Sequence, residues 1–222
     1  MLSKLFLKTL PVLMGYIPLG MAFGLLYTQL GTPWYYGLLM SLIVYAGSGQ
    51  FLLVALLAAH AGYAEIAIAT FLLNLRHLFY GLSIMEETKG FGWRRHYIRF
   101  ALTDETFALL KGVEIAPNER EESFFLMALL HHFYWCLGSV MGIALGESSG
   151  FSWEGIEFSL TALFVVLTLE LFLKNPSKKP FYLALLVGVG GLFFFPSAHM
   201  LILSILTVVG LLYGGYLLER RS

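Results

Sequence analysis

Hydrophobic residues form long, almost uninterrupted runs along this chain, and polar residues gather in a few short segments. About 20 consecutive apolar residues are enough for a helix to cross a hydrocarbon core roughly 30 Å thick. Applied to the sequence, this length predicts membrane spans at 10–30, 34–58, 63–85, 123–146, 157–174, 180–195 and 197–217. The pattern therefore predicts an all-α, polytopic integral membrane protein with about seven transmembrane helices.

Two of these spans contain residues that disfavour a regular helix. Pro11 and Pro18 fall inside span 10–30, which is therefore expected to be kinked or interrupted. The middle of span 34–58 contains the small and polar residues Gly47, Ser48, Gly49 and Gln50. Unwound backbone at mid-membrane depth is tolerated where it lines a cavity or is buried in protein, and there it can bind a substrate. The alternative is a tightly packed patch in which Gln50 bonds to a neighbouring helix.

Composition supports the membrane assignment. Hydrophobic residues make up 58% of the 222 residues and charged residues only 13%, about half the charged share of a typical soluble domain. The formal net charge is zero, which gives no electrostatic hold on nucleic acid. A single cysteine, Cys136, excludes an internal disulfide.

The charged residues are unevenly distributed, and this predicts the orientation of the chain. Half of them fall within 86–122, which is expected to be a cytoplasmic or interfacial connector. Loops that carry Lys and Arg tend to remain in the cytoplasm, and both the connector, with six such residues, and the loop with Lys178 and Lys179 carry them. Seven spans then place the N-terminus outside, although Lys4 and Lys8 would violate the same rule.

Two parts of the sequence resemble each other at a constant offset of 118 residues. The matching residues are Tyr16, Gly20, Gly24, Gly37, Ser41 and Leu42 in the first copy and Tyr134, Gly138, Gly142, Gly155, Ser159 and Leu160 in the second. Because three spans precede the second copy, the two copies are expected to run in opposite directions, as a 3+3 inverted repeat typical of secondary transporters. The predicted organisation is a first half (10–85), the connector (86–122), a second half (123–195) and an extra helix (197–217).

Arg76 lies near the centre of span 63–85, with Asn74, His77 and Tyr80 close to it in sequence. A cation at that depth costs several kcal/mol unless it is paired or used. Helical geometry places Asn74 and His77 on one face and Arg76 and Tyr80 on the adjoining face, so the helix is expected to be central or to line an aqueous path. The structural alternative is an arginine held by carbonyls or a buried carboxylate.

The acidic residues that could pair with Arg76 are Asp104 and Glu105. Glu170 is a further embedded carboxylate, but it lies near the cytoplasmic end of span 157–174 and could extend to the interface. Asp104 and Glu105 lie in the stretch 98–113, which has three interpretations. It could re-enter the bundle and pair with Arg76, lie on the membrane surface as an amphipathic helix, or add an eighth span. His77 could relay protons, although a lone buried histidine more often only donates a hydrogen bond.

Several motifs in matching order resemble the AzlC family, the large subunit of bacterial branched-chain amino acid exporters. They are GYIPLGMAFGLL (15–26), SLIVYAGSGQF (41–51), NLRHLFYGLS (74–83), ALTDETFAL (101–109) and SLTALFVVL (159–167). The resemblance implies export of branched-chain amino acids across the bacterial inner membrane, with methionine or toxic analogues as further candidates. It also implies a small AzlD-type membrane subunit as partner.

The residues and the resemblance together predict a multi-pass carrier, with no catalytic residues, cofactor or metal. The predicted substrate-binding residues are Gly47, Ser48, Gly49, Gln50, Asn74, Arg76 and Tyr80, and the predicted coupling or charge-pair residues are His77, Asp104, Glu105 and Glu170. Phe51 and Leu78 are expected to receive the aliphatic side chain. Three rival interpretations are an intramembrane enzyme with a Ser48–His77 dyad, a passive channel and a subunit that only scaffolds its partner.

Overall fold

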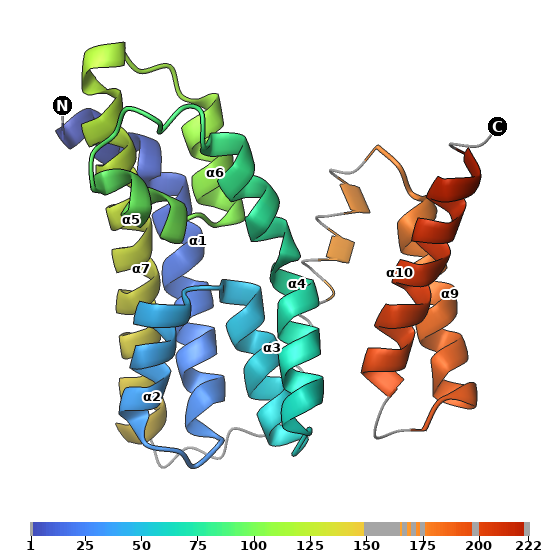
Figure 1. The fold of residues 1–222 in the computed structure, drawn as a ribbon. Coiled ribbons are helices and arrows are strands. Elements are labelled where there is room, and N and C mark those ends of the chain that lie inside the picture. Colours follow the sequence, from blue (N-terminus) through green and yellow to red (C-terminus); the bar gives the residue numbers. More distant parts are fainter. Residues whose placement is uncertain are drawn as a thin grey trace. The chain divides into compact units, whose positions relative to one another are not determined.

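The computed structural model describes residues 2–148, 165, 168–169, 172–173, 176–196 and 200–219, and every regular element within them is helical. The elements are α1 (Leu2–Thr28), α2 (Trp34–Leu39), the π-helix η1 (Met40–Val44), α3 (Gly47–Ala58), α4 (Tyr63–Ile84), α5 (Arg94–Phe100), α6 (Asp104–Gly112), the 3₁₀-helix η2 (Pro117–Glu119), α7 (Arg120–Ser148), α9 (Lys179–Phe194) and α10 (Met200–Glu219). Figure 1 shows their order along the chain. They form two compact units: residues 1–59 with 70–152, and residues 60–69 with 153–222.

Three helices in the described part of the chain are long and apolar enough to cross a membrane. They are Leu5–Thr28, Tyr63–Ile84 and Pro117–Ser148. The remaining apolar helices are shorter. Two of them, α2–η1 and α3, divide the predicted span 34–58 between them. Pro11 and Pro18 lie inside the continuous α1. Of the two outcomes predicted for span 10–30, the interruption is therefore wrong, and the kink stays a prediction.

Helices α1 and α7 pack along a seam of glycines. A Cβ atom added at Gly20 would lie 2.9 Å from the backbone N of Ser139, and one added at Gly138 would lie 2.6 Å from the carbonyl O of Ile17. Gly24 meets Gly142 in the same way. Only glycine permits this approach of two backbones, in which dispersion contacts hold the helices together.

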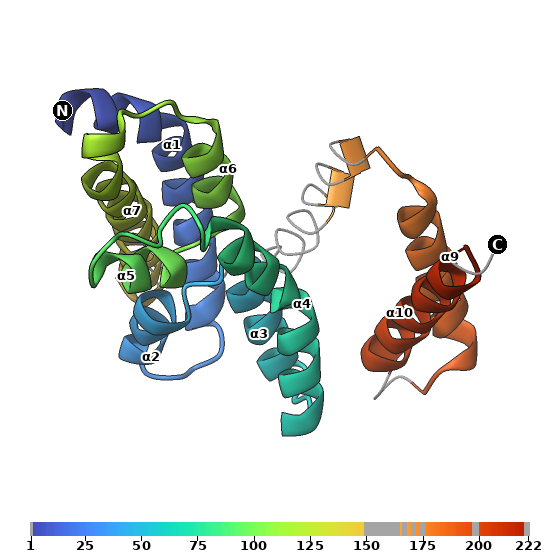
Figure 2. The same cartoon turned by 45° about the horizontal axis from the view of Figure 1, so that its top comes forward.

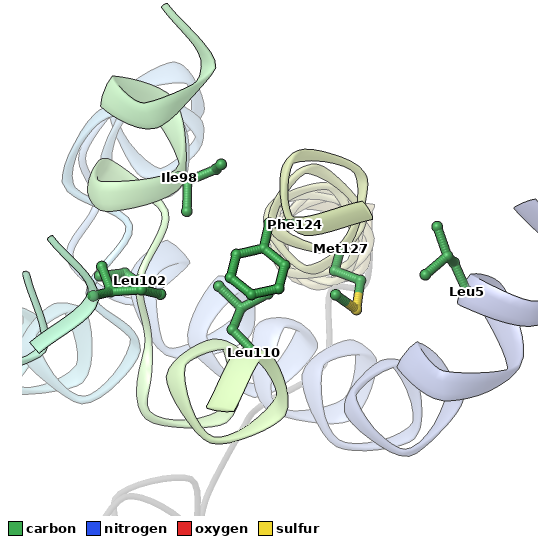
Figure 3. Close-up of a cluster of buried hydrophobic side chains, with 7 residues drawn as sticks. Leu5, Ile98, Leu102, Leu110, Phe124 and Met127 are labelled. Atoms are coloured by element: carbon green, nitrogen blue, oxygen red, sulfur yellow. The ribbon is translucent and has the colours of Figure 1, made fainter. Parts of the chain in front are cut away.

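A buried hydrophobic cluster shows the directions in which the long helices run. It brings together the start of α1 (Leu5), the end of α4 (Ile84) and the start of α7 (Phe124 and Met127). Ile98 of α5 and Leu110 of α6, with Leu102 between these helices, complete it, so the charged connector packs at this end (Figure 3). Helices α1 and α7 therefore leave the cluster in parallel, and α4 returns to it.

The segment 34–58 enters the bundle and turns back at mid-height (Figures 1 and 2). Helix α2 starts beside the ends of α1 and α7, because Gly37 packs on Tyr27 and Ile143. Tyr45, at the turn, has a left-handed backbone (φ 43°), and its ring lies 4.3 Å from that of His132 in the middle of α7. The start of α3 then packs on Trp135 through Gly47. This segment is a hairpin of two half-length helices, which we call the lower hairpin.

The connector forms a second hairpin from the opposite end. Helix α5 runs inward along α7: the ring of Trp93 contacts that of Phe125, and the ring of Phe100 contacts that of His132. The chain turns at 101–103, and α6 runs outward until Lys111 pairs with Glu87 just beyond α4. We call α5–α6 the upper hairpin. The two turns meet, because the rings of Tyr45 and Phe100 are 6.4 Å apart.

These hairpins correct the predicted topology. Since the lower hairpin turns back, only two full-length helices, α1 and α4, precede α7 along the described chain. The first helices of the two sequence copies consequently run parallel, and the equivalent residues Gly20 and Gly138 face each other. The inverted arrangement predicted for this pair is wrong, because it counted 34–58 as a crossing. Gly155, Ser159 and Leu160 of the second copy lie outside the described residues.

The second unit contains the helical pair α9–α10, in place of the predicted spans 180–195 and 197–217. Helix α9 ends at Phe194, just before Pro196, as the proline predicts. A Cβ atom added at Gly191 of α9 would lie 2.7 Å from Ser204 Oγ of α10. Small residues therefore bring these two helices together as well.

The seam can be tested with two glycines of α1. In Gly20→Ala, the new Cβ meets the backbone of α7, so we expect the protein to lose about 1–3 kcal/mol of stability. Gly15→Ala is the matched control: its Cβ meets nothing within 4 Å, and alanine favours a helix by up to about 1 kcal/mol. Thermal unfolding in detergent measures both. Equal melting temperatures would contradict the seam.

The lower hairpin makes a prediction about sidedness. In a Cys136→Ser background, Gln29→Cys and Lys89→Cys should react with a membrane-impermeant maleimide from opposite sides of the membrane. The reason is that residue 29 follows the far end of α1, whereas residue 89 follows the end of α4 beside the N-terminus. If 34–58 crossed the membrane instead, both cysteines would be labelled from the same side.

Candidate functional site

Arg76 occupies the place where the two hairpins meet the middle of α4. Its Nη1 donates a hydrogen bond to Asp104 Oδ2 of the upper hairpin at 2.5 Å, and its Nη2 donates to Ser48 Oγ of the lower hairpin at 2.5 Å. The side chains of Arg76 and Asp104 are 30% and 37% exposed within the described structure. Arg76 and Asp104 thus form a partly exposed ion pair, and Arg76 links α4 to both hairpins.

The carboxylates are positioned by the start of α6. Thr103 caps this helix, since its side chain accepts a hydrogen bond from the backbone N–H of Thr106 at 3.1 Å. Asp104 and Glu105 occupy the first turn, where the helix dipole favours negative charge. The sequence Thr-Asp-Glu-Thr therefore encodes both the turn of the upper hairpin and the acidic end that it brings to Arg76.

The ion pair leaves some of its polar atoms unused. Arg76 Nε and Asp104 Oδ1 are buried without a hydrogen-bond partner in the described part of the chain. The same holds for Oδ1 of Asn74, which lies two residues before Arg76 on α4. Buried polar atoms normally have partners, so this group has spare capacity for a polar ligand or for water. Both a donor and acceptors remain available.

Gly49 brings α3 against α4. A Cβ atom at this position would lie 3.0 Å from Nδ2 of Asn74, which itself donates to the carbonyl O of Thr70 at 2.9 Å. No side chain caps the start of α3, at Gly47 and Ser48. The positive end of a helix with uncapped amides therefore lies beside the guanidinium group of Arg76.

Gln50 faces away from Arg76. Its Nε2 donates to Ser41 Oγ at 3.1 Å, and its Oε1 accepts from Trp135 Nε1 at 2.8 Å. Ser41 donates in turn to Ser139 of α7. These bonds fit the alternative interpretation, in which Gln50 ties its hairpin to a neighbouring helix. Gln50 is not placed among the residues around Arg76.

Tyr80 and His77 lie beside the ion pair on α4. The Tyr80 ring stacks on Phe107 of α6 with centroids 4.6 Å apart. His77 Nδ1 lies 3.3 Å from the carbonyl O of Asn74 in its own helix. Ser48 is hydrogen-bonded to Arg76 rather than to His77, so the described geometry does not form the Ser48–His77 dyad of the enzyme interpretation.

Sequence reasoning missed a series of hydrogen-bonded polar side chains that leads from the exposed Glu105 to the buried His131. Tyr16 OH of α1 donates to Glu105 Oε2 at 2.7 Å and lies 2.5 Å from Thr103 Oγ1. The chain continues from Thr103 to Thr106 at 2.9 Å and from Thr106 to His131 Nδ1 of α7 at 2.8 Å. The Thr-x-x-Thr spacing at the start of α6 was the available signal, but it gives no indication of Tyr16 or His131.

The predicted charge-pair residue Glu170 lies outside the described residues. Within the described ranges, no group of three His, Cys, Asp or Glu side chains is arranged to hold a metal ion. The residues that the structure groups around Arg76, and that form the candidate site, are Ser48, Gly49, Asn74, Tyr80, Asp104 and Glu105, with His77 beside them and Gly47 at the edge.

Comparison with known proteins places this arrangement in a family. Residues 11–148, which contain both hairpins, α4, α7 and all but the first turns of α1, match the family model described as AzlC protein. The chain belongs to the AzlC family. An AzlC relative in Bacillus subtilis, named branched-chain amino acid transport protein AzlC, is 31% identical over 92% of this chain and 81% of its own length.

Other relatives are membrane proteins by name. One from Helicobacter pylori, named only as an uncharacterized membrane protein, is 37% identical over 92% of this AzlC-family chain and 90% of its own length. The inner membrane protein YgaZ of Escherichia coli is 30% identical over 76% of this chain and 72% of its own. No solved structure matches the chain significantly. The apolar helices and these relatives agree that this is a membrane protein.

The ion pair should be visible as an energetic coupling. Asp104→Asn or Arg76→Gln alone leaves one charge without its partner, and we expect each to cost about 1–3 kcal/mol, between the values for exposed and buried pairs. The double variant removes both charges and should recover part of that loss. Thermal unfolding of all four proteins measures the coupling.

Lys89→Gln is the control for this cycle. Lys89 and Glu86 form a pair 4.0 Å apart whose side chains are 78% and 83% exposed. Its removal should leave the melting temperature nearly unchanged. Strictly additive losses for Arg76 and Asp104 would contradict the proposed pairing.

Proposed function

We propose that this protein is the substrate-translocating subunit of a branched-chain amino acid exporter in a bacterial inner membrane. The observation that carries the proposal is Arg76, which lies between the start of α3 and the carboxylate of Asp104. The name of the Bacillus subtilis relative supports the substrate class. The family resemblance supports a small AzlD-type membrane subunit as partner.

The ion pair explains how an empty carrier tolerates charge at this depth. A lone guanidinium in hydrocarbon costs several kcal/mol, and Asp104 offsets this cost when no substrate is present. An amino acid zwitterion carries a carboxylate that can pair with Arg76 and an ammonium group that can pair with Asp104. Its carboxylate would take the place of Asp104 at Arg76, beside Ser48 and the uncapped amides of α3, and its ammonium group would bind Asp104 or Glu105. Substrate binding thus keeps every charge paired.

The aliphatic side chain of the substrate needs an apolar surface beside these charges. Phe51 is buried against Phe23 and Trp135, and Leu78 is exposed, so the contacts of neither residue bring it to Arg76. The stacked rings of Tyr80 and Phe107 lie one helical turn beyond Arg76 and Asp104 on the same two helices. We assign the apolar contact to this pair of rings.

The hairpins suggest how access would alternate. Each hairpin starts at a different end of the α1–α7 pair, and both turns reach the site. Movement of the lower hairpin would open the site from one side and movement of the upper hairpin from the other. A passive channel would need both paths open together, whereas here Arg76 holds both hairpins at once.

Transport of labelled leucine, isoleucine, valine and methionine into proteoliposomes tests the function, with this subunit alone and together with its partner. We expect saturable counterflow of the branched-chain substrates. Arg76→Ala should abolish it while the protein still inserts and remains monodisperse, because the substrate carboxylate loses its cation. Lys89→Ala in the connector is the control and should transport normally. Normal counterflow by Arg76→Ala would overturn the assignment, and unsaturable flux would favour a channel.

A further inference from the structure

The series of hydrogen-bonded polar side chains from Glu105 to His131 has a direction. An ionised Glu105 can only accept, so the single hydroxyl proton of Tyr16 points toward it. Thr103 must then donate its hydroxyl proton to Tyr16 OH. For the same reason, Thr106 must donate its hydroxyl proton to Thr103 Oγ1. His131 must therefore donate from Nδ1 to Thr106 Oγ1. If all four contacts are hydrogen bonds, the tautomer of His131 is fixed with its proton on Nδ1.

At the His131 end of this series of hydrogen bonds, one ring nitrogen has no hydrogen-bond partner among the described residues. His131 is fully buried (0% exposed), and its Nε2 has no hydrogen-bond partner in the described part of the chain. With the proton on Nδ1, Nε2 carries a free lone pair. A buried imidazole normally has both nitrogens bonded or solvated, so this nitrogen is placed to accept a proton. Glu105, at the other end, is exposed beside Asp104.

We propose that Glu105 and His131 are the two ends of a proton relay through Thr106, Thr103 and Tyr16. One proton binds at His131 Nε2, the Nδ1 proton passes to Thr106, and each hydroxyl passes its own proton to the next group. One proton arrives at Glu105, which becomes neutral. His131 is left neutral with its proton on Nε2, and every hydrogen bond of the chain is reversed. The same steps in reverse release the proton.

The relay gives the proposed transport a coupling ion, and so it rests on the proposed function. With Glu105 ionised, the site has two carboxylates and one guanidinium group, an excess of negative charge that attracts the ammonium group of a substrate. With Glu105 protonated, this excess is gone and the substrate is held less tightly. Proton and substrate therefore compete, and by linkage each weakens the binding of the other. Export of an amino acid would be exchanged for entry of a proton.

Other charged or titratable groups surround the two ends. Around Glu105 they are Tyr16 of α1, Tyr45 of the lower hairpin, His77, Tyr80 and Arg76 of α4, and Asp104 next to it. Around His131 they are Tyr16 and Tyr134. Among the described residues, only Tyr16 lies near both ends, and it is itself one of the hydrogen-bonded groups of the relay.

Tyr16→Phe tests the relay, because it removes one hydroxyl and leaves the ring. We expect Tyr16→Phe to retain leucine counterflow but to lose accumulation driven by a pH gradient. Tyr134→Phe is the matched control: Tyr134 is the repeat equivalent of Tyr16, but its hydroxyl bonds to Thr9 outside the relay. It should retain both activities. Normal accumulation by Tyr16→Phe would overturn the relay.

A spectroscopic readout tests the relay without transport. Nitrogen-15 NMR of histidine-labelled protein at neutral pH, with His131→Asn used for assignment, should show His131 protonated on Nδ1. Glu105→Gln should shift it toward Nε2, since an amide can donate to Tyr16 and reverse the chain. An Nε2-protonated His131 in the unmodified protein would overturn the relay.

The failure of the relay can be distinguished from the failure of the proposed function. If the unmodified protein exchanges leucine but ignores a pH gradient, the relay fails and the proposed function stands. If it transports no leucine, the proposed function fails, and this tautomer still decides the relay.

Discussion

The contact between the backbones of α1 and α7 is the constraint on which the rest of this structure depends. Glycines face glycines along the seam, so the two helices lie closer together than side chains would allow. Their common direction follows from the contacts in register between Gly20 and Gly138 and between Gly24 and Gly142. The middle of α7 then presents His131, His132 and Trp135 to the hairpin turns, which need protein around them because their backbone is irregular.

The site follows from this arrangement, because two helices start at mid-height and point their positive ends inward. One start, in the lower hairpin, is uncapped and lies beside Ser48; the other is capped by Thr103 and carries Asp104 and Glu105. Arg76 joins them. A cation, two carboxylates and free amides thus meet within one group of residues, which suits a ligand that carries both charges. The AzlC family model covers all of these residues.

Several features could be predicted from the sequence because they depend on local chemistry. Hydrophobic length gave α4 and α7 nearly within their observed bounds. The small residues around Gly47 marked a break, and an arginine in an apolar run required a partner, which the structure shows to be Asp104. The predicted inverted arrangement of the two sequence copies failed, because it required knowing where the chain turns back within the membrane. Residues 34–58 have the length and hydropathy of a crossing helix, and tertiary contacts such as that of Tyr45 with His132 reveal that the chain turns back.

The sequence by itself determined that the protein belongs in a membrane, that its long apolar segments are helical, and that Arg76 must be neutralised. The reason is that burial of apolar surface and the cost of a lone charge act on each segment separately. Only the tertiary structure decided that α1 and α7 run parallel, that Gln50 faces α7 rather than Arg76, and that Tyr16 links Glu105 toward His131. These depend on contacts between residues far apart in the chain, such as Tyr16 with Thr103 and Thr106 with His131. Periodicity within one helix carries no information about which distant helix lies against it.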